Sequence, residues 1–156
     1  MKKRYVWVIL LLLVIGLIGI FTGGEEETTE DKIKNMVHNI IGKEVENEDS
    51  IVSLSLTSGN VRIVMKKIPL SQNTYKKQLL NDSKQILEKL SGLKDVSYVN
   101  LEWQGKLIDQ NGNSEWKPVM RINVEKETLD KTNWEDLNEN DIENVADDYW
   151  QNEIFD

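Results

Sequence analysis

The hydrophobic and polar positions of the chain alternate in two places in a way that predicts β-hairpins. In the first, Ser50 to Thr57 is followed by Asn60 to Lys67, and every second side chain is apolar. A period of two is typical of strands that place one face on a core. Gly59 lies between the two runs and readily takes the positive φ that a tight turn needs. We therefore expect a hairpin here.

The second hairpin is predicted further along the chain. Val99 to Trp103 and Met120 to Val124 alternate in the same way, and the turn region between them contains Asn111-Gly112, a strong hairpin signal. Pro118 has no N–H to donate to a neighbouring strand. We therefore expect the last strand to begin at a sheet edge or to carry a bulge near Pro118.

Three other stretches repeat their apolar residues at spacings of three and four, which predicts helices with one buried face. These stretches are Asp31 to Ile41, which Gly42 ends; Gln72 to Leu90, for which Ser71 is the expected N-cap; and Asn140 to Gln151. The long middle helix carries several lysines on its outer face.

The order helix, hairpin, helix, hairpin, helix predicts an α+β fold. Each hairpin has one apolar face, and the long helix covers both faces if the hairpins join into one sheet. We expect a two-layer sandwich in which two β-hairpins form an antiparallel-rich four-stranded sheet, with the long helix between them and flanking N- and C-terminal helices. Residues 32–156 then form a single domain, large enough to bury one core.

A continuous apolar run precedes this domain. Tyr5 to Phe21 carries no charge and reaches about 25 Å as a helix, close to the thickness of a hydrocarbon core. Lys2 to Arg4 precede it and Glu25 to Glu27 follow it, so the positive-inside rule places the N-terminus in the cytoplasm and the domain outside. We expect residues 1–21 to be a basic stub and one transmembrane helix, and residues 22–31 to be an acidic linker. The alternative is a cleaved signal peptide and a secreted domain.

Composition narrows the classes of function. The formal charge is −8 for the whole chain and becomes −11 without the three cations at positions 2–4, which disfavours nucleic acid as a partner. The absence of cysteine removes disulfides, thiolate catalysis and thiolate zinc sites. The single histidine, His38, excludes a histidine-rich metal centre, and no cofactor is indicated.

The turn of the second predicted hairpin is a candidate cation site. Asp109, Asn111, Asn113 and Glu115 place oxygen-bearing side chains in one short segment, and Ca²⁺ prefers oxygen ligands from a compact loop. The spacing departs from an EF-hand loop, because the glycine is not at the sixth position and no glutamate stands at the twelfth. The same residue types are also ordinary turn formers.

The C-terminal part of the chain combines acids with aromatic rings. Trp134, Asp147, Asp148, Tyr149 and Trp150 form a candidate partner surface. Tryptophan and tyrosine supply large contact areas, and carboxylates steer the approach of a cationic partner. A solvated helix face with an aromatic inner edge explains the same residues. A hydrolase with paired carboxylates is a third interpretation, and it requires two acids that meet in one cleft.

The motifs of common enzyme classes are missing from the sequence. It contains no G-x-S-x-G, P-loop, G-x-G-x-x-G or H-E-x-x-H motif. His38 lies among the apolar positions of the first predicted helix, without a serine or aspartate partner at an informative spacing. An enzyme is therefore the less favoured class, and no catalytic residue is assigned.

The segment from Asp95 to Trp150 carries a family resemblance. It contains VSYVNLEWQGKLIDQNGN, MRINVEKETLDKTNWEDL and DIENVADDYW. Its hairpin, its Asn-Trp loop and its final Asp-Tyr-Trp resemble the C-terminal half of small exported or membrane-anchored proteins of Gram-positive bacteria, a family of unknown function. The resemblance implies an extracytoplasmic location and no activity for any residue.

These patterns together predict a non-enzymatic, membrane-anchored extracytoplasmic domain. Its expected partner is another envelope protein or an envelope polymer, besides the membrane that Tyr5 to Phe21 enters. The alternatives are a Ca²⁺-responsive module built on Asp109 to Glu115 and a carboxylate-dependent envelope hydrolase.

Overall fold

The computed structural model of the protein describes residues 27–155. The predicted membrane anchor, Tyr5 to Phe21, lies outside the described residues, as do residues 22–26 of the predicted linker. Within residues 27–155, no helix is both long enough and apolar enough to cross a membrane. The described part is α+β, as the sequence predicts.

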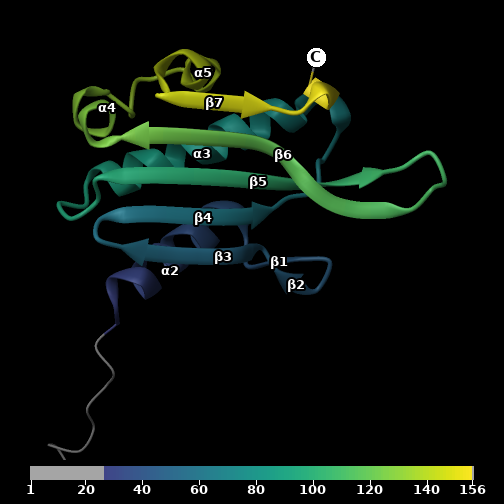
Figure 1. The fold of residues 1–156 in the computed structure, drawn as a ribbon, viewed down its shortest axis with the longest axis horizontal. Helices are drawn as coiled ribbons and strands as arrows, with labels where there is room; N and C mark the ends of the chain where they lie inside the picture. Colours follow the sequence, from purple (N-terminus) through teal and green to yellow (C-terminus); the bar gives the residue numbers. More distant parts are fainter. Residues whose placement is uncertain (1–26, 156) are drawn as a thin grey trace, which may run out of the picture.

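Figure 1 shows the order of the helices and strands along the chain. The helices are α2 (Thr29–Ile41), α3 (Tyr75–Ser91), α4 (Lys126–Lys131) and α5 (Ile142–Val145). Short 3₁₀ helices cover Gln72–Thr74, Glu139–Asp141 and Glu153–Phe155. The strands are β1 (Glu44–Val45), β2 (Glu48–Asp49), β3 (Ile51–Thr57), β4 (Asn60–Lys66), β5 (Tyr98–Ile108), β6 (Ser114–Glu125) and β7 (Asp148–Gln151).

Five of the strands form one mixed sheet in the order β3-β4-β5-β6-β7. The neighbours in this sheet are antiparallel except for β4 and β5, which lie parallel. The parallel pair follows from α3, because a helix that crosses between two strands lets the second strand start at the same end of the sheet as the first. β1 and β2 pair separately as a small antiparallel hairpin.

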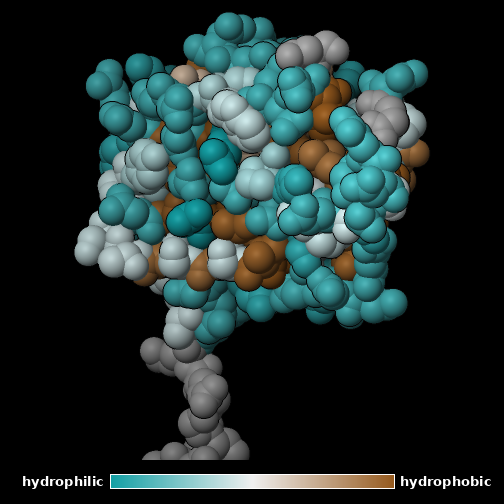
Figure 2. All heavy atoms as spheres, turned by 45° about the vertical axis from the view of Figure 1, so that its right-hand side comes forward, coloured by the Kyte–Doolittle hydropathy of each residue, from teal (hydrophilic) through white to brown (hydrophobic). Residues whose placement is uncertain are grey.

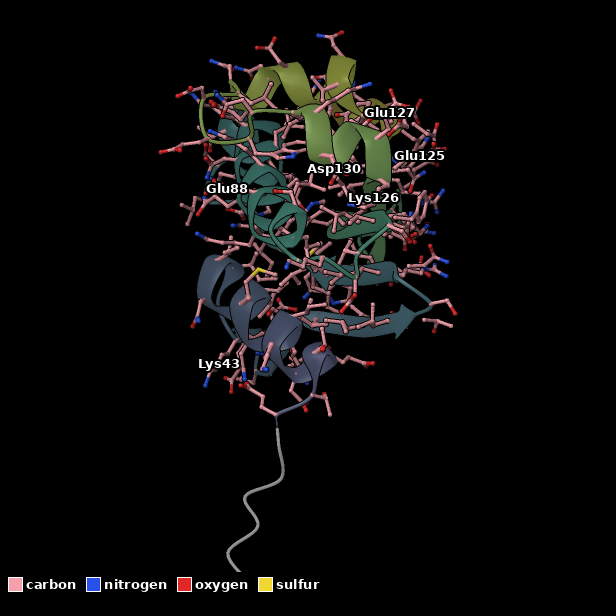
Figure 3. The ribbon with its side chains drawn as sticks, turned by 90° about the vertical axis from the view of Figure 1, so that its left-hand side faces the viewer. Lys43, Glu88, Glu125, Lys126, Glu127 and Asp130 are labelled. Carbon is pink, nitrogen blue, oxygen red and sulfur yellow. The ribbon has the colours of Figure 1, made fainter. Side chains whose placement is uncertain are left out.

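The hydrophobic core lies between the sheet and the two longest helices. Figure 3 shows α2 and α3 on one side of the strands, so the other face of the sheet is left uncovered. The largest fully buried side chains are Ile33, Ile63, Met65, Leu79, Leu80, Ile86, Leu87, Leu90, Leu101, Trp103, Met120 and Ile122. Burying each such side chain contributes about 1.5–3 kcal/mol, so this single core is the main source of stability.

The local turn and bulge predictions are confirmed. Ser58 and Gly59 have φ of 50° and 84°, so the first hairpin closes with a tight turn that needs positive φ at both positions. In the second turn, Gly112 has φ of 83°. The register between β5 and β6 shifts next to Pro118, which is the bulge expected there.

The helix starts differ from the predicted ones for reasons of capping. α2 begins slightly earlier, because the side chain of Thr28 accepts from the N–H of Asp31 while the Asp31 carboxylate accepts from the N–H of Thr28. α3 begins later, at Tyr75, because Gln72–Thr74 is a 3₁₀ turn. Ser71 is therefore not the N-cap residue; its hydroxyl bonds to that of Thr74 at 2.8 Å.

The prediction of a C-terminal helix from Asn140 to Gln151 is wrong. Only α5 is α-helical there, and the chain then turns into β7, which pairs with β6. Asp147 drives the change, since its carboxylate accepts from the N–H of Glu125 at 2.7 Å and from the hydroxyl of Thr128 at 3.0 Å. These bonds hold the chain beside β6. The predicted four-stranded sheet is accordingly wrong as well, because β7 adds a fifth strand.

Candidate functional site

The uncovered face of the sheet is the candidate functional site. Successive side chains of a strand point to opposite faces, so the residues between the core positions project from this face. The strand register aligns them in rows that cross the sheet. One row is Ser55, Arg62, Asn100, Asn123 and Asp148, and the next is Ser53, Val64, Glu102, Arg121 and Trp150. These rows bring together side chains from five strands.

A shallow open groove of about 460 Å³ crosses this face. Its lining residues are Ser55, Thr57, Asn60, Val61, Arg62, Tyr98, Asn100, Glu102 and Arg121. Most of them carry hydrogen-bonding groups, and the oblique view in Figure 2 shows a largely hydrophilic surface with smaller hydrophobic patches. An open groove of this polarity suits an extended polar ligand better than an apolar small molecule.

Arg62 is the most informative residue in the groove. Arginine occurs at positions 4, 62 and 121, so both arginines of the described residues line this groove. The guanidinium of Arg62 has no hydrogen bond or ion pair to another described residue. A guanidinium presents a planar fork of donors that matches a carboxylate or a phosphate. Arg62 is thus available to an anionic group of a ligand.

Arg121 is held in place by two neighbours. Its Nε donates to Glu102 Oε2 at 2.9 Å, and its guanidinium lies 5.1 Å from the centre of the Trp150 ring. Both contacts fix the guanidinium plane over the sheet, the second through the attraction of a cation to a ring face. Glu102 is the one acid in the groove lining, and Arg121 neutralises it. The lining therefore does not supply the two carboxyl groups that the hydrolase interpretation requires.

Two amide side chains continue the row of Arg62 across the sheet. Asn100 donates to the Asn123 side chain, and Asn123 donates to Asp148 Oδ2 at 2.7 Å. Burial raises the pKa of Tyr98, and the negative charges of Asp148 and Glu125 raise it further. The Tyr98 hydroxyl therefore keeps its proton at neutral pH and is able to donate it in a hydrogen bond to a ligand.

The structure divides the predicted partner surface between the core and the open face. Trp134 is 4% exposed, and its indole donates to the backbone oxygen of Leu129 at 3.0 Å, so it belongs to the core. Tyr149 packs against the core from β7, where burial raises the pKa of its hydroxyl. Asp147 uses its oxygens for bonds within the fold. Asp148 and Trp150 alone stand on the open face.

The predicted cation loop lies at the far end of the β5-β6 hairpin from the groove. The side-chain amide of Asn113 donates to Asp109, and the N–H groups of Asn113 and Asn111 donate to one oxygen of Asp109 at 2.9 and 2.8 Å. These bonds lower the pKa of Asp109. Glu115 pairs with Lys117 at 3.0 Å. Among the described residues no group of three or more His, Asp or Glu side chains is arranged to hold a metal ion. The side chains of this loop thus support the turn.

None of the nine groove-lining residues, Arg62, Tyr98 and Asn100 among them, was identified as a site residue from the sequence. The available signal was the alternation itself, since Val61 and Ile63 face the core and so place Arg62 on the opposite face. The missing information was the pairing of β4 with β5, which brings Arg62 beside Asn100. Along the chain, α3 separates β4 from β5, so the residues that line the groove are distant in sequence. No single short stretch of the sequence therefore indicates the groove.

His38, for which the sequence indicates no partner, has one in Asp49. Its Nε2 lies 2.8 Å from Asp49 Oδ1, and Lys34 Nζ lies 3.1 Å from the other oxygen. Burial raises the pKa of Asp49, but the N–H of Ile51 and the His38 and Lys34 side chains lower it by more, to about 2. This cluster fixes the β1-β2 hairpin to α2, away from the groove.

We expect this cluster to make the stability of the fold fall at acidic pH. An unfolded aspartate has a pKa of about 3.9, so a folded pKa of about 2 means that the folded state favours the charged form. The contribution of Asp49 is complete above about pH 4 and is lost as the pH falls through 2. Urea unfolding between pH 2 and 6 measures it.

Two variants test the source of this pH dependence. Asp49→Asn should flatten the unfolding free energy below pH 4, because the titrating group is gone. Asp95→Asn, at an exposed position without a hydrogen bond or ion pair to another described residue, should keep the wild-type profile. An Asp49→Asn profile that matches the wild type would assign the acid sensitivity to other carboxylates.

Comparison with known proteins does not assign the chain to a family. No protein-family model matches the chain, and no curated protein or solved structure matches it. The groove is therefore the starting point for the function.

Proposed function

We propose that the protein is a non-enzymatic, membrane-anchored extracytoplasmic binding module and that the open face of its sheet is the binding surface. The observation that carries the binding surface is the groove in which Arg62 has no partner among the described residues. The apolar run from Tyr5 to Phe21 and the charges on either side of it support the anchored location. The resemblance to exported proteins of Gram-positive bacteria points the same way.

The ligand that suits this groove best is an envelope polymer of sugar units that carry carboxylate or phosphate groups. A sugar chain presents many hydroxyl groups, which need both donors and acceptors. Ser55, Thr57, Asn60 and Asn100 supply both kinds of group. Arg62 then pairs with the anionic group through two parallel hydrogen bonds. The open shape of the groove admits a chain that continues beyond it at both ends.

The net negative charge of the protein does not prevent such binding. At physiological ionic strength, exposed charges further apart than about 8 Å are largely screened from one another. Within the groove the charges are those of Arg62, Arg121 and Glu102, so the local balance is positive. The net charge of the domain thus disfavours nucleic acid, whereas Arg62 still binds an isolated anionic group.

Binding of defined polymers to the full chain in detergent tests the proposal. We expect polygalacturonate to bind and its fully methyl-esterified form to bind at least about ten-fold more weakly, because a hydrogen bond to a charged group contributes about 1.5–3 kcal/mol. A polyol-phosphate polymer provides the phosphate arm of the experiment. Isothermal calorimetry gives the affinity in each case.

Matched variants test whether the ligand binds in the groove. Arg62→Gln should weaken polygalacturonate binding about ten-fold. Lys89→Gln makes the same change of charge on α3, on the helix side of the sheet, and should leave binding within two-fold. Equal binding of the charged and esterified polymers, or equal affinities of the two variants, would refute the proposal. If a purified acidic protein binds through Arg62 and none of the polymers binds, the ligand is an acidic protein and not an envelope polymer.

A further inference from the structure

β3 is an edge strand without the usual protection. Among the described residues its one strand neighbour is β4, so no described strand pairs with the backbone groups on its other side. The segment from Ser50 to Ser58 contains no charged residue and no proline, in a chain in which 29% of residues are charged. In natural proteins, lysines, prolines, bulges or a covering element normally prevent an edge strand from pairing with another chain. Figures 1 and 3 show α2 on the helix side of the sheet, with its first turns reaching past β3, and no strand of the described residues pairs along the outer side of β3.

The opposite edge of the same sheet has the usual protection. β7 is four residues long, and it begins with the charged Asp148 directly after Asp147. β3 has one bulge, at its start between Ile51 and Ser53, and then runs regularly from Ser53 to Thr57. The two edges therefore differ in kind, and an unprotected regular edge is a template for another strand.

The register of the first hairpin shows which backbone groups point outward. Thr57 and Asn60 close a two-residue turn, so they exchange hydrogen bonds, and such pairs alternate along an antiparallel ladder. Ser55 and Ser53 therefore bond toward β4 as Thr57 does. Leu54 and Leu56 direct their N–H and C=O groups away from the sheet, where they are free to pair with a new strand.

We propose that β3 pairs antiparallel with β3 of a second copy of this chain, about a two-fold axis at Ser55. This register places Ser55 opposite the partner's Ser55, Leu54 opposite the partner's Leu56 and Ser53 opposite the partner's Thr57. Hydroxyl residues thus meet hydroxyl residues on the open face, and leucines meet leucines on the helix side. Both leucines are half-buried in the single chain, so pairing removes further apolar area from water.

The second copy suits this edge better than an unrelated strand, because the edge is complementary to itself. No charged side chain of β3 opposes its own copy. The pairing also joins the two grooves, since Ser55 lies beside Arg62 in the same row. The row then runs from one Arg62 across both serines to the other Arg62. The result is a continuous ten-strand surface, twice the five strands of one chain.

Single cysteines in this cysteine-free chain test the register directly. Ser55→Cys places two sulfurs at a pair whose Cα atoms are about 4.5 Å apart, within the range that a disulfide spans. Ser53→Cys, also exposed, lies about 13 Å from its copy, because the two are offset by four residues. The full chain in detergent is oxidised and examined by gel electrophoresis.

We expect a disulfide-linked dimer with Ser55→Cys and almost none with Ser53→Cys. Association through the apolar run would raise both yields equally, so the contrast between them reports on β3. Ser55→Lys should also make the full chain monomeric in sedimentation experiments, because like charges then stand opposite each other. Equal cross-linking of the two cysteine variants, or a chain that stays monomeric at millimolar concentration, would overturn the proposal.

Discussion

Replacing Trp103 by alanine is expected to destabilise the fold by about 3–5 kcal/mol, more than any other substitution proposed for this chain. Trp103 lies on β5 and is the largest of the fully buried side chains. Its Nε1 donates to Ser83 Oγ at 2.8 Å, and that hydroxyl donates to the backbone oxygen of Leu79 at 2.7 Å. The indole therefore joins the middle of the sheet to the middle of α3. Alanine leaves a large cavity and removes this link.

Two further variants separate the cavity from the hydrogen bond. Trp103→Phe fills most of the space but leaves Ser83 without its donor, so we expect a cost of about 1–2 kcal/mol. Trp150→Ala removes an indole that is 40% exposed and lies against the Arg121 guanidinium, so it should destabilise the fold by only about 0.5–1 kcal/mol. Urea unfolding of the full chain provides all three values. A Trp103→Ala cost no larger than that of Trp150→Ala would contradict the central place of Trp103.

The parts of the fold with local signals were predictable from the sequence. Alternation and a turn residue lie next to each other in both hairpins, and Gly59 and Asn111-Gly112 stand where the tight turns form. The long apolar stripe of α3 likewise needs no information from elsewhere in the chain. These elements are the ones that short-range physical rules decide.

The elements set by tertiary contacts were not predictable in the same way. The residues of β7 belong to a stretch with helical spacing, yet β6 offered a free edge and Asp147 found hydrogen-bond donors on Glu125 and Thr128. Bonds between distant segments outweighed the local preference. Trp134 was assigned to the partner surface because tryptophan supplies a large contact area, but its loop turns the indole inward, where it donates to the backbone oxygen of Leu129. Solvent exposure in a loop depends on what the loop covers.

The groove depends on the least predictable feature, the parallel pairing of β4 with β5. That pairing sets Arg62 beside Asn100 and Val64 beside Glu102. Antiparallel joining of the two hairpins would have put different side chains together. The chemistry of each strand was readable from the sequence, and the site they form together was not.

Gly59 lies where β4 and β5 begin side by side. We expect Gly59→Ala to lower the free energy of unfolding by on the order of 2–4 kcal/mol. Gly59 has φ of 84°, which strains a residue with a side chain, and an added Cβ would lie 2.7 Å from the backbone oxygen of Asp95 and 2.6 Å from Ser97 Oγ. The backbone oxygen is part of the rigid chain before β5 and moves only if the strand moves.

Gly112→Ala is the matched control for Gly59→Ala. Gly112 has almost the same φ, 83°, but an added Cβ there meets no atom within 4 Å. Its cost should therefore reflect backbone strain alone, about 1 kcal/mol. The difference between the two variants in thermal or urea unfolding measures how closely the first hairpin turn approaches the start of β5. Equal costs would show that this close approach is unimportant.

The same change at Gly59 should also weaken the groove. The backbone oxygen of Gly59 accepts from the N–H groups of Ser97 and Tyr98 at 2.8 and 3.3 Å, so it sets where β5 begins beside β4. Thr57, Asn60 and Tyr98 lie around this point and line the groove. A collision that pushes the turn away from β5 therefore separates Tyr98 from Arg62. Gly59→Ala should lower the affinity for polygalacturonate at temperatures where the variant is still folded, whereas Gly112→Ala should leave it unchanged.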